Sequence, residues 1–307
     1  MVVIDDIIMK NKECGNFVAL GSFDGLHYGH LSLVRKAVEL AKENNGKSVV
    51  FTYKNHPKTL VKPEAAPKLI MDLDTKIQYL EEENVDLVIL RTFTKEFMTI
   101  SAEEFIKLLC ETYNIKGIVV GFNFRFGYKN SGNIELLKSL EDKYGYKVYV
   151  MEPYKHNNEV ISSTRIREAI LKGNVKEAST MLLKPYFLKG EVIYGKQIGR
   201  TIGIPTANLK YNHEMIIPEK GVYYTNVEYG GKKFKGLTSV GNNPTVNGKE
   251  LTIETYILDF NKMIYGEEIK VYFIERIREE IKFNSLDELV DQIEKDKEFI
   301  KDKNLII

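Results

Sequence analysis

The chain has 307 residues, of which 43% are hydrophobic and 28% charged, and its formal net charge is +1. This composition is typical of a globular protein with room for two domains, and it argues against a nucleic acid or an anionic membrane as partner. No apolar run is long enough to span a membrane. The two cysteines, Cys14 and Cys110, are far apart, and the first residues lack the apolar core of a signal peptide, so we expect a cytoplasmic protein.

The first half of the chain alternates short apolar runs with segments of helical periodicity. Short strands that are apolar on both faces and separated by helices are typical of a parallel sheet covered on both sides. We therefore predict a Rossmann-like α/β fold for this half. The predicted strands are 17–20, 48–53, 86–90, 117–121 and 147–151.

Helices are predicted where apolar residues recur every three to four positions. Ser101 followed by Glu104 is the signature of a capping box, which satisfies two N–H groups at a helix start. The predicted helices of this region are 31–42, 74–83, 101–113, 133–144, 163–171 and 175–183.

The pattern changes near Lys184 and Pro185, where strands interrupted by glycine begin. Gly230–Gly231 lies between two of them and predicts a tight hairpin turn. These features are typical of an antiparallel β-barrel or sandwich. The predicted strands are 187–194, 222–229, 232–240, 252–258 and 268–277.

A final helix is predicted over residues 285–300. It begins with a second capping-box pattern at Ser285 and Glu288. Its apolar residues recur at helical spacing and predict one buried stripe. The predicted stripe consists of Leu286, Leu289, Val290 and Ile293.

The most informative segment is 21–30 (GSFDGLHYGH), which follows the first predicted strand and opens the first helix. Glycines let the backbone approach a ligand, and a helix N-terminus offers N–H groups and partial positive charge that suit phosphate. His27 and His30 are three residues apart and can point at one phosphate chain. A histidine at a helix start is more often a cap or a solvated side chain, and two histidines can also bind a metal. The pair together with three glycines favours phosphate.

This segment resembles the HxGH signature of the nucleotidyltransferase superfamily, and its longer form, GxFDGxHxGH, resembles the bacterial FMN adenylyltransferases. The resemblance implies that His27 and His30 bind the triphosphate of ATP and stabilise charge at the α-phosphate, with no covalent intermediate. It also implies ATP contacts from other residues of the same loop, namely Gly21, Phe23, Asp24 and Gly25.

Two later segments resemble further motifs of this family, 121–127 (GFNFRFG) and 161–167 (ISSTRIR). The resemblance implies that Asn123 holds nucleotide or flavin phosphate. Two other interpretations stay open, because the alternating phenylalanines of the first segment can be core residues and the second segment can simply cap a helix. Whether His56 lines the same cleft is also left open. The implied ATP ligands of the second segment are Ser163, Thr164 and Arg167.

The second half carries a glycine-rich segment, 195–203 (GKQIGRTIG), followed by 204–208 (IPTAN). Backbone N–H groups of such a loop can wrap a phosphate chain, and the side-chain oxygens of Thr206 and Asn208 are ligands that Mg²⁺ prefers. The arrangement GRxxGxPTAN resembles the riboflavin kinases. The resemblance implies ATP or flavin contacts from Gly195, Lys196, Gly199, Arg200, Gly203, Thr206, Asn208 and Arg278, with Thr206 and Asn208 as metal ligands.

Glu254 lies in the segment 253–260 (IETYILDF), which resembles the riboflavin kinase pattern E-x-H-I-x-D-F with Tyr256 in place of the usual histidine. The resemblance implies that Glu254 is catalytic and accepts the hydroxyl proton during phosphoryl transfer. An alternating strand also places many glutamates in solvent, so the strand pattern alone does not distinguish the two interpretations. No role is assigned to Tyr256.

The order of the motifs resembles the bifunctional prokaryotic FAD synthetases over about residues 15–300. The implied domains are a Rossmann-like α/β FMN adenylyltransferase at 1–183 and a riboflavin kinase at 184–307, which is an antiparallel β-barrel with a C-terminal helix. The implied reactions convert riboflavin to FMN and FMN to FAD with ATP and Mg²⁺, in a monomer or weak oligomer. Two alternatives stay open: nucleotidyl transfer to another phosphorylated substrate, and a catalytically inactive regulator that binds flavin or nucleotide.

Overall fold

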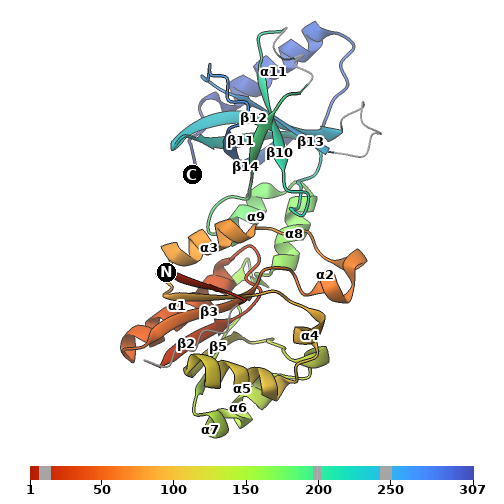
Figure 1. The fold of residues 1–307 in the computed structure, drawn as a ribbon. Helices are drawn as coiled ribbons and strands as arrows, with labels where there is room; N and C mark the ends of the chain where they lie inside the picture. Colours follow the sequence, from red (N-terminus) through yellow and green to blue (C-terminus); the bar gives the residue numbers. More distant parts are fainter. Residues whose placement is uncertain (7–14, 196–198, 200–201, 243–250) are drawn as a thin grey trace. The chain divides into compact units, whose positions relative to one another are not determined.

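The computed structural model describes residues 1–6, 15–195, 199, 202–242 and 251–307. The chain forms two compact units, Met1–Ser163 and Thr164–Ile307, and each is described by itself (Figure 1). The predicted boundary between residues 183 and 184 stays a prediction. Residues 164–183, on the N-terminal side of that boundary, belong to the second unit, where α9 (Val175–Met181) packs against strand β14 (Glu268–Arg278) of the barrel.

The first unit is built on a six-stranded parallel sheet in the order β1-β4-β3-β2-β5-β6. This confirms the predicted α/β fold. Strand β1 was not predicted, because three of its four residues are exposed and it pairs only at the sheet edge. The strands are β1 (Val2–Asp5), β2 (Asn16–Leu20), β3 (Lys47–Tyr53), β4 (Leu87–Arg91), β5 (Ile115–Gly121) and β6 (Lys147–Met151).

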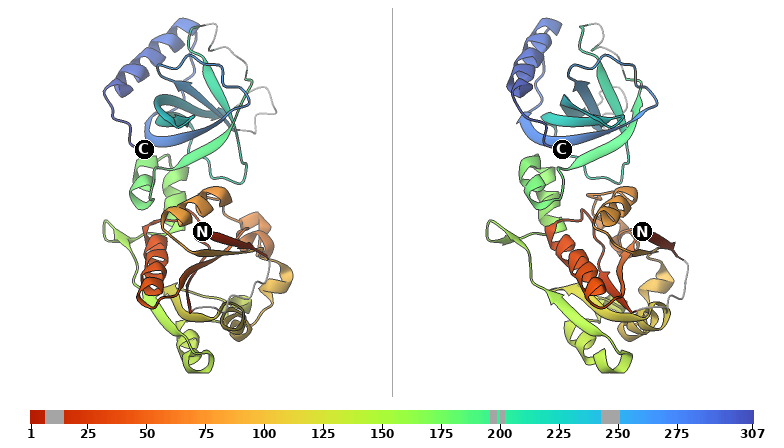
Figure 2. Two further views of the ribbon diagram at one scale, coloured as in Figure 1. Left: turned by 60° about the vertical axis from the view of Figure 1, so that its left-hand side comes forward. Right: turned by 90° about the vertical axis from the view of Figure 1, so that its left-hand side faces the viewer.

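Helices cover both faces of this sheet (Figure 2). Helix α5 packs Phe105, Ile106 and Leu109 into the main core of one face, whereas α1 contacts β2, β3 and β5 on the other. The predicted capping box of α5 is present. The predicted helix 133–144 is instead two short helices. The principal helices are α1 (Tyr28–Glu43), α3 (Leu73–Glu82), α5 (Ala102–Tyr113), α6 (Ile134–Ser139) and α7 (Glu141–Tyr144).

Shorter elements connect these parts of the first unit. Most lie in loops near the carboxyl ends of the strands. A two-stranded hairpin pairs Lys155 with Val160 and His156 with Glu159. The connecting elements are α2 (Lys58–Val61), η1 (Pro63–Ala65), α4 (Lys95–Met98), η2 (Tyr128–Asn130), β7 (Lys155–His156) and β8 (Glu159–Val160).

The second unit is a closed antiparallel barrel in the order β10-β13-β12-β11-β14-β9. This confirms the antiparallel barrel that the resemblance implies and excludes the sandwich that the strand pattern alone left open. Gly230–Gly231 joins β11 to β12 with φ of 55° and 73°, so the predicted hairpin is confirmed. Strand β10 was not predicted. The strands are β9 (Phe187–Ile193), β10 (Thr206–Tyr211), β11 (Gly221–Tyr229), β12 (Lys232–Asn242), β13 (Leu251–Ile257) and β14 (Glu268–Arg278).

Helix α8 (Ser163–Leu171) has the predicted bounds, and helix α11 (Leu286–Lys301) closes the chain. The Ser285 side chain caps α11 by accepting from the Glu288 N–H, but the Glu288 carboxylate accepts from the N–H of Asn284 instead of completing the predicted box. The predicted apolar stripe is wrong at its start, since Leu286 is 54% exposed. Burial is concentrated later in the helix, at Asp296 and Ile300.

Candidate active sites

A cavity of about 420 Å³ opens at the carboxyl ends of β2, β3, β5 and β6. This edge of a parallel sheet is where ligands bind in open α/β folds. The predicted ATP ligands that line the cavity come from three segments that are far apart in the chain. Six residues predicted to bind ATP line it, namely Gly21, Phe23, His27, His30, Asn123 and Ser163.

His27 and His30 lie at the start of α1 with their rings stacked, the ring centres 3.6 Å apart. The Nδ1 atom of His27 accepts a hydrogen bond from the N–H of His30 at 3.2 Å and so caps the helix. His27 is only 5% exposed. Because Nδ1 accepts, Nε2 carries the hydrogen of the neutral ring and can donate it. His27 therefore combines the two functions that the sequence left as alternatives, a helix cap and a candidate phosphate donor.

The backbone of the glycine loop has an unusual conformation that its surroundings hold in place. Phe23, Gly25 and Leu26 have φ of 51°, 82° and 37°. Such conformations persist only where neighbouring groups fix them. The Ser163 hydroxyl donates to the carbonyl of Asp24 at 2.9 Å, which ties Ser163 to the loop.

Asp24 and Gly25 do not line the cavity. The Asp24 side chain is buried, and its carboxylate accepts hydrogen bonds from the N–H groups of Ile70 and Met71 at 3.0 and 3.2 Å. A Cβ at Gly25 would lie 3.0 Å from the Ile70 side chain. Their predicted contact with ATP stays a prediction, but the described contacts fit a supporting role for the loop.

The 121–127 segment contains both a core part and a cavity part. Phe126 is buried and stacks on Phe124, with ring centres 5.5 Å apart. Phe122 is 44% exposed and lines the cavity with Asn123. Phe124 and Phe126 line the cavity as well, so the core and cavity interpretations overlap in this segment, and Asn123 keeps its candidate role in binding phosphate.

Three other candidates are not placed at this cavity. Thr164 and Arg167 lie further along α8, in the second compact unit, and their contact with ATP stays a prediction. His56, whose role the sequence left open, does not line the cavity. Its Nδ1 atom accepts a hydrogen bond from the N–H of Lys58 at the start of α2.

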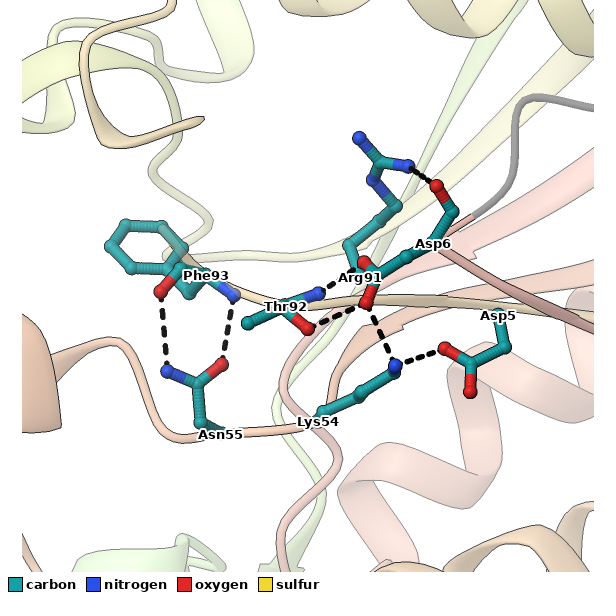
Figure 3. Close-up of polar contacts among 7 residues, drawn as sticks. All are labelled: Asp5, Asp6, Lys54, Asn55, Arg91, Thr92 and Phe93. Carbon is teal, nitrogen blue, oxygen red and sulfur yellow. Dashed lines mark hydrogen bonds and ion pairs between the residues drawn. The ribbon is translucent and has the colours of Figure 1, made fainter. Parts of the chain in front are cut away.

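A polar network fixes the chain where β1, β3 and β4 end (Figure 3). Lys54 forms ion pairs with Asp5 and Asp6, and Asp6 also accepts from the backbone N–H and hydroxyl of Thr92. Asn55 exchanges two hydrogen bonds with the backbone of Phe93. Since Tyr53 and Pro57, on either side of this segment, line the cavity, the network shapes one of its walls.

Replacing Asp6 by asparagine is expected to reduce stability in a pH-dependent way. Burial alone raises the pKa of Asp6, but bonds from Lys54 and Thr92 and the Lys54 charge outweigh it and lower the pKa to about 2. The ion pair of Asp6 with Lys54 therefore stabilises the fold fully at pH values above 3.8, the ordinary pKa of an aspartate. This contribution decreases below that pH and is lost as the pH falls through about 2. The side chain is 39% exposed, so solvent screening limits the effect to roughly 1 kcal/mol or less.

Urea unfolding of the wild type and of Asp6→Asn would measure this difference at about pH 6 and about pH 3. Asparagine tolerates the φ of 52° at this position, which makes it a matched replacement. The gap in unfolding free energy should be smaller at the lower pH. An equal gap at both values would mean that the ion pair does not contribute.

A second cavity, of about 310 Å³, lies at the barrel of the second unit. Antiparallel pairing of β10 with β13 places Asn208 opposite Glu254 and Thr206 opposite Tyr256. The Thr206 hydroxyl lies 3.4 Å from a carboxylate oxygen of Glu254. Glu254 is half-buried and lines the cavity, which favours the catalytic interpretation over that of a fully solvated strand residue. The predicted residues that line this cavity are Gly199, Thr206, Glu254 and Arg278.

The glycines before β10 permit close packing of the chain. A Cβ at Gly195 would lie 2.3 Å from the Asn208 amide nitrogen, so glycine lets the backbone reach that side chain. The Gly199 carbonyl accepts from the N–H of Ile204 at 2.7 Å, and Gly203 has φ of 76°. Two predicted ligands of this loop, Lys196 and Arg200, lie outside the described residues.

Arg278 is held by a buried carboxylate that the sequence analysis missed. Its guanidinium donates to both oxygens of Asp296, with a shortest distance of 2.7 Å, and Asp296 is 3% exposed. Gln292 donates to the same carboxylate at 2.9 Å. The sequence did contain a sign of this buried aspartate. Asp296 is three residues after Ile293 and four before Ile300, so helical periodicity places it on the same face of α11 as these two apolar residues, which pack on the barrel.

The sequence analysis also missed a lysine that contacts the glycine loop. Lys76 of α3 is buried, and its Nζ atom donates to the carbonyls of Ser22 and Tyr53 at 2.9 and 3.4 Å. Here too, the sequence places a charged residue on the buried side of a helix. Lys76 shares that side of α3 with Thr75, Tyr79 and Leu80.

Comparisons with known proteins match both halves of the chain. The family model described as FAD synthetase matches residues 9–165, and the model described as riboflavin kinase matches residues 182–303. Three curated relatives carry the name bifunctional riboflavin kinase/FMN adenylyltransferase. The relative from Haemophilus influenzae is 38% identical and covers 94% of each chain, that from Bacillus subtilis is 36% identical (95% and 93%), and that from Escherichia coli K12 is 34% identical (92% and 90%).

A solved structure described as a macrolide-efflux protein from Streptococcus pneumoniae superposes with a TM-score of 0.90, at 37% identity and 99% coverage of both chains. Among the residues described in the present structure, no helix is long and apolar enough to cross a membrane. Two family models, matched in the order of the two units, and relatives 34–38% identical over at least 90% of their own length lead to one assignment. The chain belongs to the family of bifunctional riboflavin kinase/FMN adenylyltransferases.

Proposed function

We propose that the chain phosphorylates riboflavin to FMN in its C-terminal half and adenylylates FMN to FAD in its N-terminal half, with ATP as co-substrate in both reactions. The observation that carries this proposal is the presence of two separate cavities, each lined by the motif of its own family model. Nucleotidyl transfer to another substrate would not account for the second cavity with Glu254.

At the first cavity, the FMN phosphate attacks the α-phosphate of ATP, an FMN–AMP bond forms and pyrophosphate leaves. His27, His30 and the N-terminus of α1 supply hydrogen-bond donors and positive potential where negative charge develops. No residue of the chain needs to form a covalent bond, because positioning and charge stabilisation are sufficient for this chemistry. Asn123 and Ser163 are the further phosphate ligands in this proposal.

At the second cavity, Glu254 accepts the proton of the riboflavin 5′-hydroxyl as that oxygen attacks the γ-phosphate of ATP, and ADP leaves. The Thr206 hydroxyl and the Asn208 side-chain oxygen, two residues apart on β10, are the oxygen donors that we assign to Mg²⁺. The ion neutralises phosphate charge when bound. Arg278, oriented by Asp296, is the candidate contact to substrate.

Chromatography of the products formed from riboflavin, ATP and Mg²⁺ tests the whole proposal. FMN should appear first and FAD afterwards, and FMN supplied directly should give FAD. The absence of both products would overturn the proposal and favour a regulator that only binds. Product formed with phosphopantetheine or phosphocholine, and none with FMN, would favour the other nucleotidyltransferase class.

Removing divalent metal is expected to stop FMN formation. With excess EDTA, the oxygen donors around Thr206 hold no cation, and the charge on the transferred phosphoryl group is not neutralised. Initial rates of FMN formation with EDTA, and after restoring excess Mg²⁺, measure the effect. An undiminished rate in EDTA would contradict the assigned metal site.

A further inference from the structure

Lys76 is an unusual residue for its position. It lies on α3 among buried side chains, 6% exposed, and among the residues that the structure describes it is the one buried lysine. Moving an ammonium group out of water is costly, and a methionine could fill the same space without that cost. A buried lysine therefore needs a compensating role.

The contacts of Lys76 point to the adenylyltransferase cavity. Its Nζ atom bridges the Ser22 carbonyl of the glycine loop, at 2.9 Å, and the Tyr53 carbonyl at the end of β3, at 3.4 Å. The Thr52 hydroxyl donates to the same Ser22 carbonyl at 2.9 Å. Ser22 and Tyr53 both line the cavity, so Lys76 links two of the segments that form it.

The charge of Lys76 is sensitive to its surroundings. Burial lowers its pKa from 10.5 to about 8, and the negative charge of Asp24 on the glycine loop opposes that shift. On β3, burial raises the pKa of the Tyr53 phenol to about 12, so it stays neutral. At the start of α3, Asp72 is the N-cap and Asp74 lies in the first turn, and both are acidic groups near Lys76 in sequence.

We propose that Lys76 is a positioning residue for adenylyl transfer: its ammonium group fixes the Ser22 carbonyl against the end of β3 and adds positive charge beneath the loop that receives the ATP triphosphate. This inference rests on the proposed reaction at that cavity. Charge-assisted hydrogen bonds to two carbonyls hold the strained backbone around Phe23, and the strained backbone in turn sets the start of α1 at His27.

The proposal has a pH signature. Lys76 is cationic below about pH 8 and neutral above it, so kcat/KM for ATP in the FMN-to-FAD step should fall as the pH rises through about 8. Bound ATP is a polyanion and favours the cationic form. The matching fall in kcat should therefore lie at higher pH than the fall in kcat/KM.

Steady-state rates of FAD formation from FMN and ATP, over about pH 6.5 to 9.5, test this with the full-length chain. Supplying FMN makes the assay independent of the kinase step. We expect Lys76→Met to lower kcat/KM for ATP by at least about tenfold near pH 7 and to remove the alkaline fall. Lys76→Arg should recover part of the activity and move the fall to higher pH, because arginine stays protonated. Lys42→Met, an exposed lysine of α1, should behave as wild type.

Riboflavin phosphorylation in the same preparations, with circular dichroism, verifies that each variant is folded. A folded Lys76→Met with wild-type kcat/KM and pH dependence would overturn the inference while leaving the proposed function intact. If Lys76→Met does not fold, Lys76→Arg decides alone, because an alkaline fall that stays near pH 8 would overturn the inference. If the wild type itself makes no FAD from FMN, the proposed function fails first.

Discussion

Glu254→Gln is expected to lower the rate of FMN formation from riboflavin by about 10²- to 10⁴-fold, the usual contribution of a general base. Glutamine keeps the size of the side chain and an oxygen near the Thr206 hydroxyl, but it cannot accept the substrate proton. Conversion of FMN to FAD should change little, because the two cavities share no lining residue. Separate initial rates with riboflavin and with FMN measure the two steps.

The matched control is Glu268→Gln, an exposed glutamate on strand β14. It removes the same charge from the same unit without touching the second cavity, so both rates should stay at the wild-type level. Wild-type FMN formation by Glu254→Gln would show that Glu254 is not the base. Loss of both steps in a folded variant would contradict the assignment of one reaction to each cavity.

The double variant His27→Asn with His30→Ala is expected to accumulate FMN and make little FAD. Removing one preorganised donor at a site of developing charge typically costs about 10²- to 10³-fold in rate. Both rings lie at the start of α1, stacked on each other, so their loss removes the donors assigned to the triphosphate. Time courses from riboflavin should show FMN rising without its later decline.

Asparagine is chosen at position 27 because the Nδ1 atom of His27 also caps α1. Alanine would remove the cap, at a cost of about 1 kcal/mol, whereas asparagine is among the best capping residues. Comparing His27→Ala with His27→Asn therefore distinguishes the loss of the helix cap from the loss of the proposed hydrogen bond to ATP. If FAD formation is low in His27→Ala but at the wild-type rate in His27→Asn, with His30 intact in both, then His27 acts only as a cap and its assignment to ATP is wrong.

Much of the fold could be predicted because its signals are local. The apolar runs of the parallel strands, the helix at 163–171 and the turn at Gly230–Gly231 each follow from a few adjacent residues. Closure of the barrel could not be predicted in the same way, since alternating strands are equally consistent with a sandwich. Strand β10 was missed because Thr206 and Asn208 were interpreted only as ligands, although they also pair with β13.

In the two sites as well, residues that belong to a local motif could be predicted, whereas residues that depend on tertiary contacts could not. The cavity-lining residues of the glycine loop could be predicted from a contiguous motif. Lys76 and Asp296 could not, because each is a charged residue within an apolar pattern, and its partner is distant in sequence. The Ser22 carbonyl is 54 residues from Lys76, and Arg278 is 18 residues from Asp296. The pairing of such charges depends on tertiary structure, which helical periodicity does not contain.

The buried pair of Arg278 and Asp296 also has an evolutionary consequence. Losing one partner would leave the other as an uncompensated charge inside the unit, which typically costs about 3–5 kcal/mol, whereas replacing both by apolar residues can be nearly neutral. The two positions are therefore expected to be inherited together. In descendants of this chain, a change on strand β14 at residue 278 should be accompanied by a change on helix α11 at residue 296.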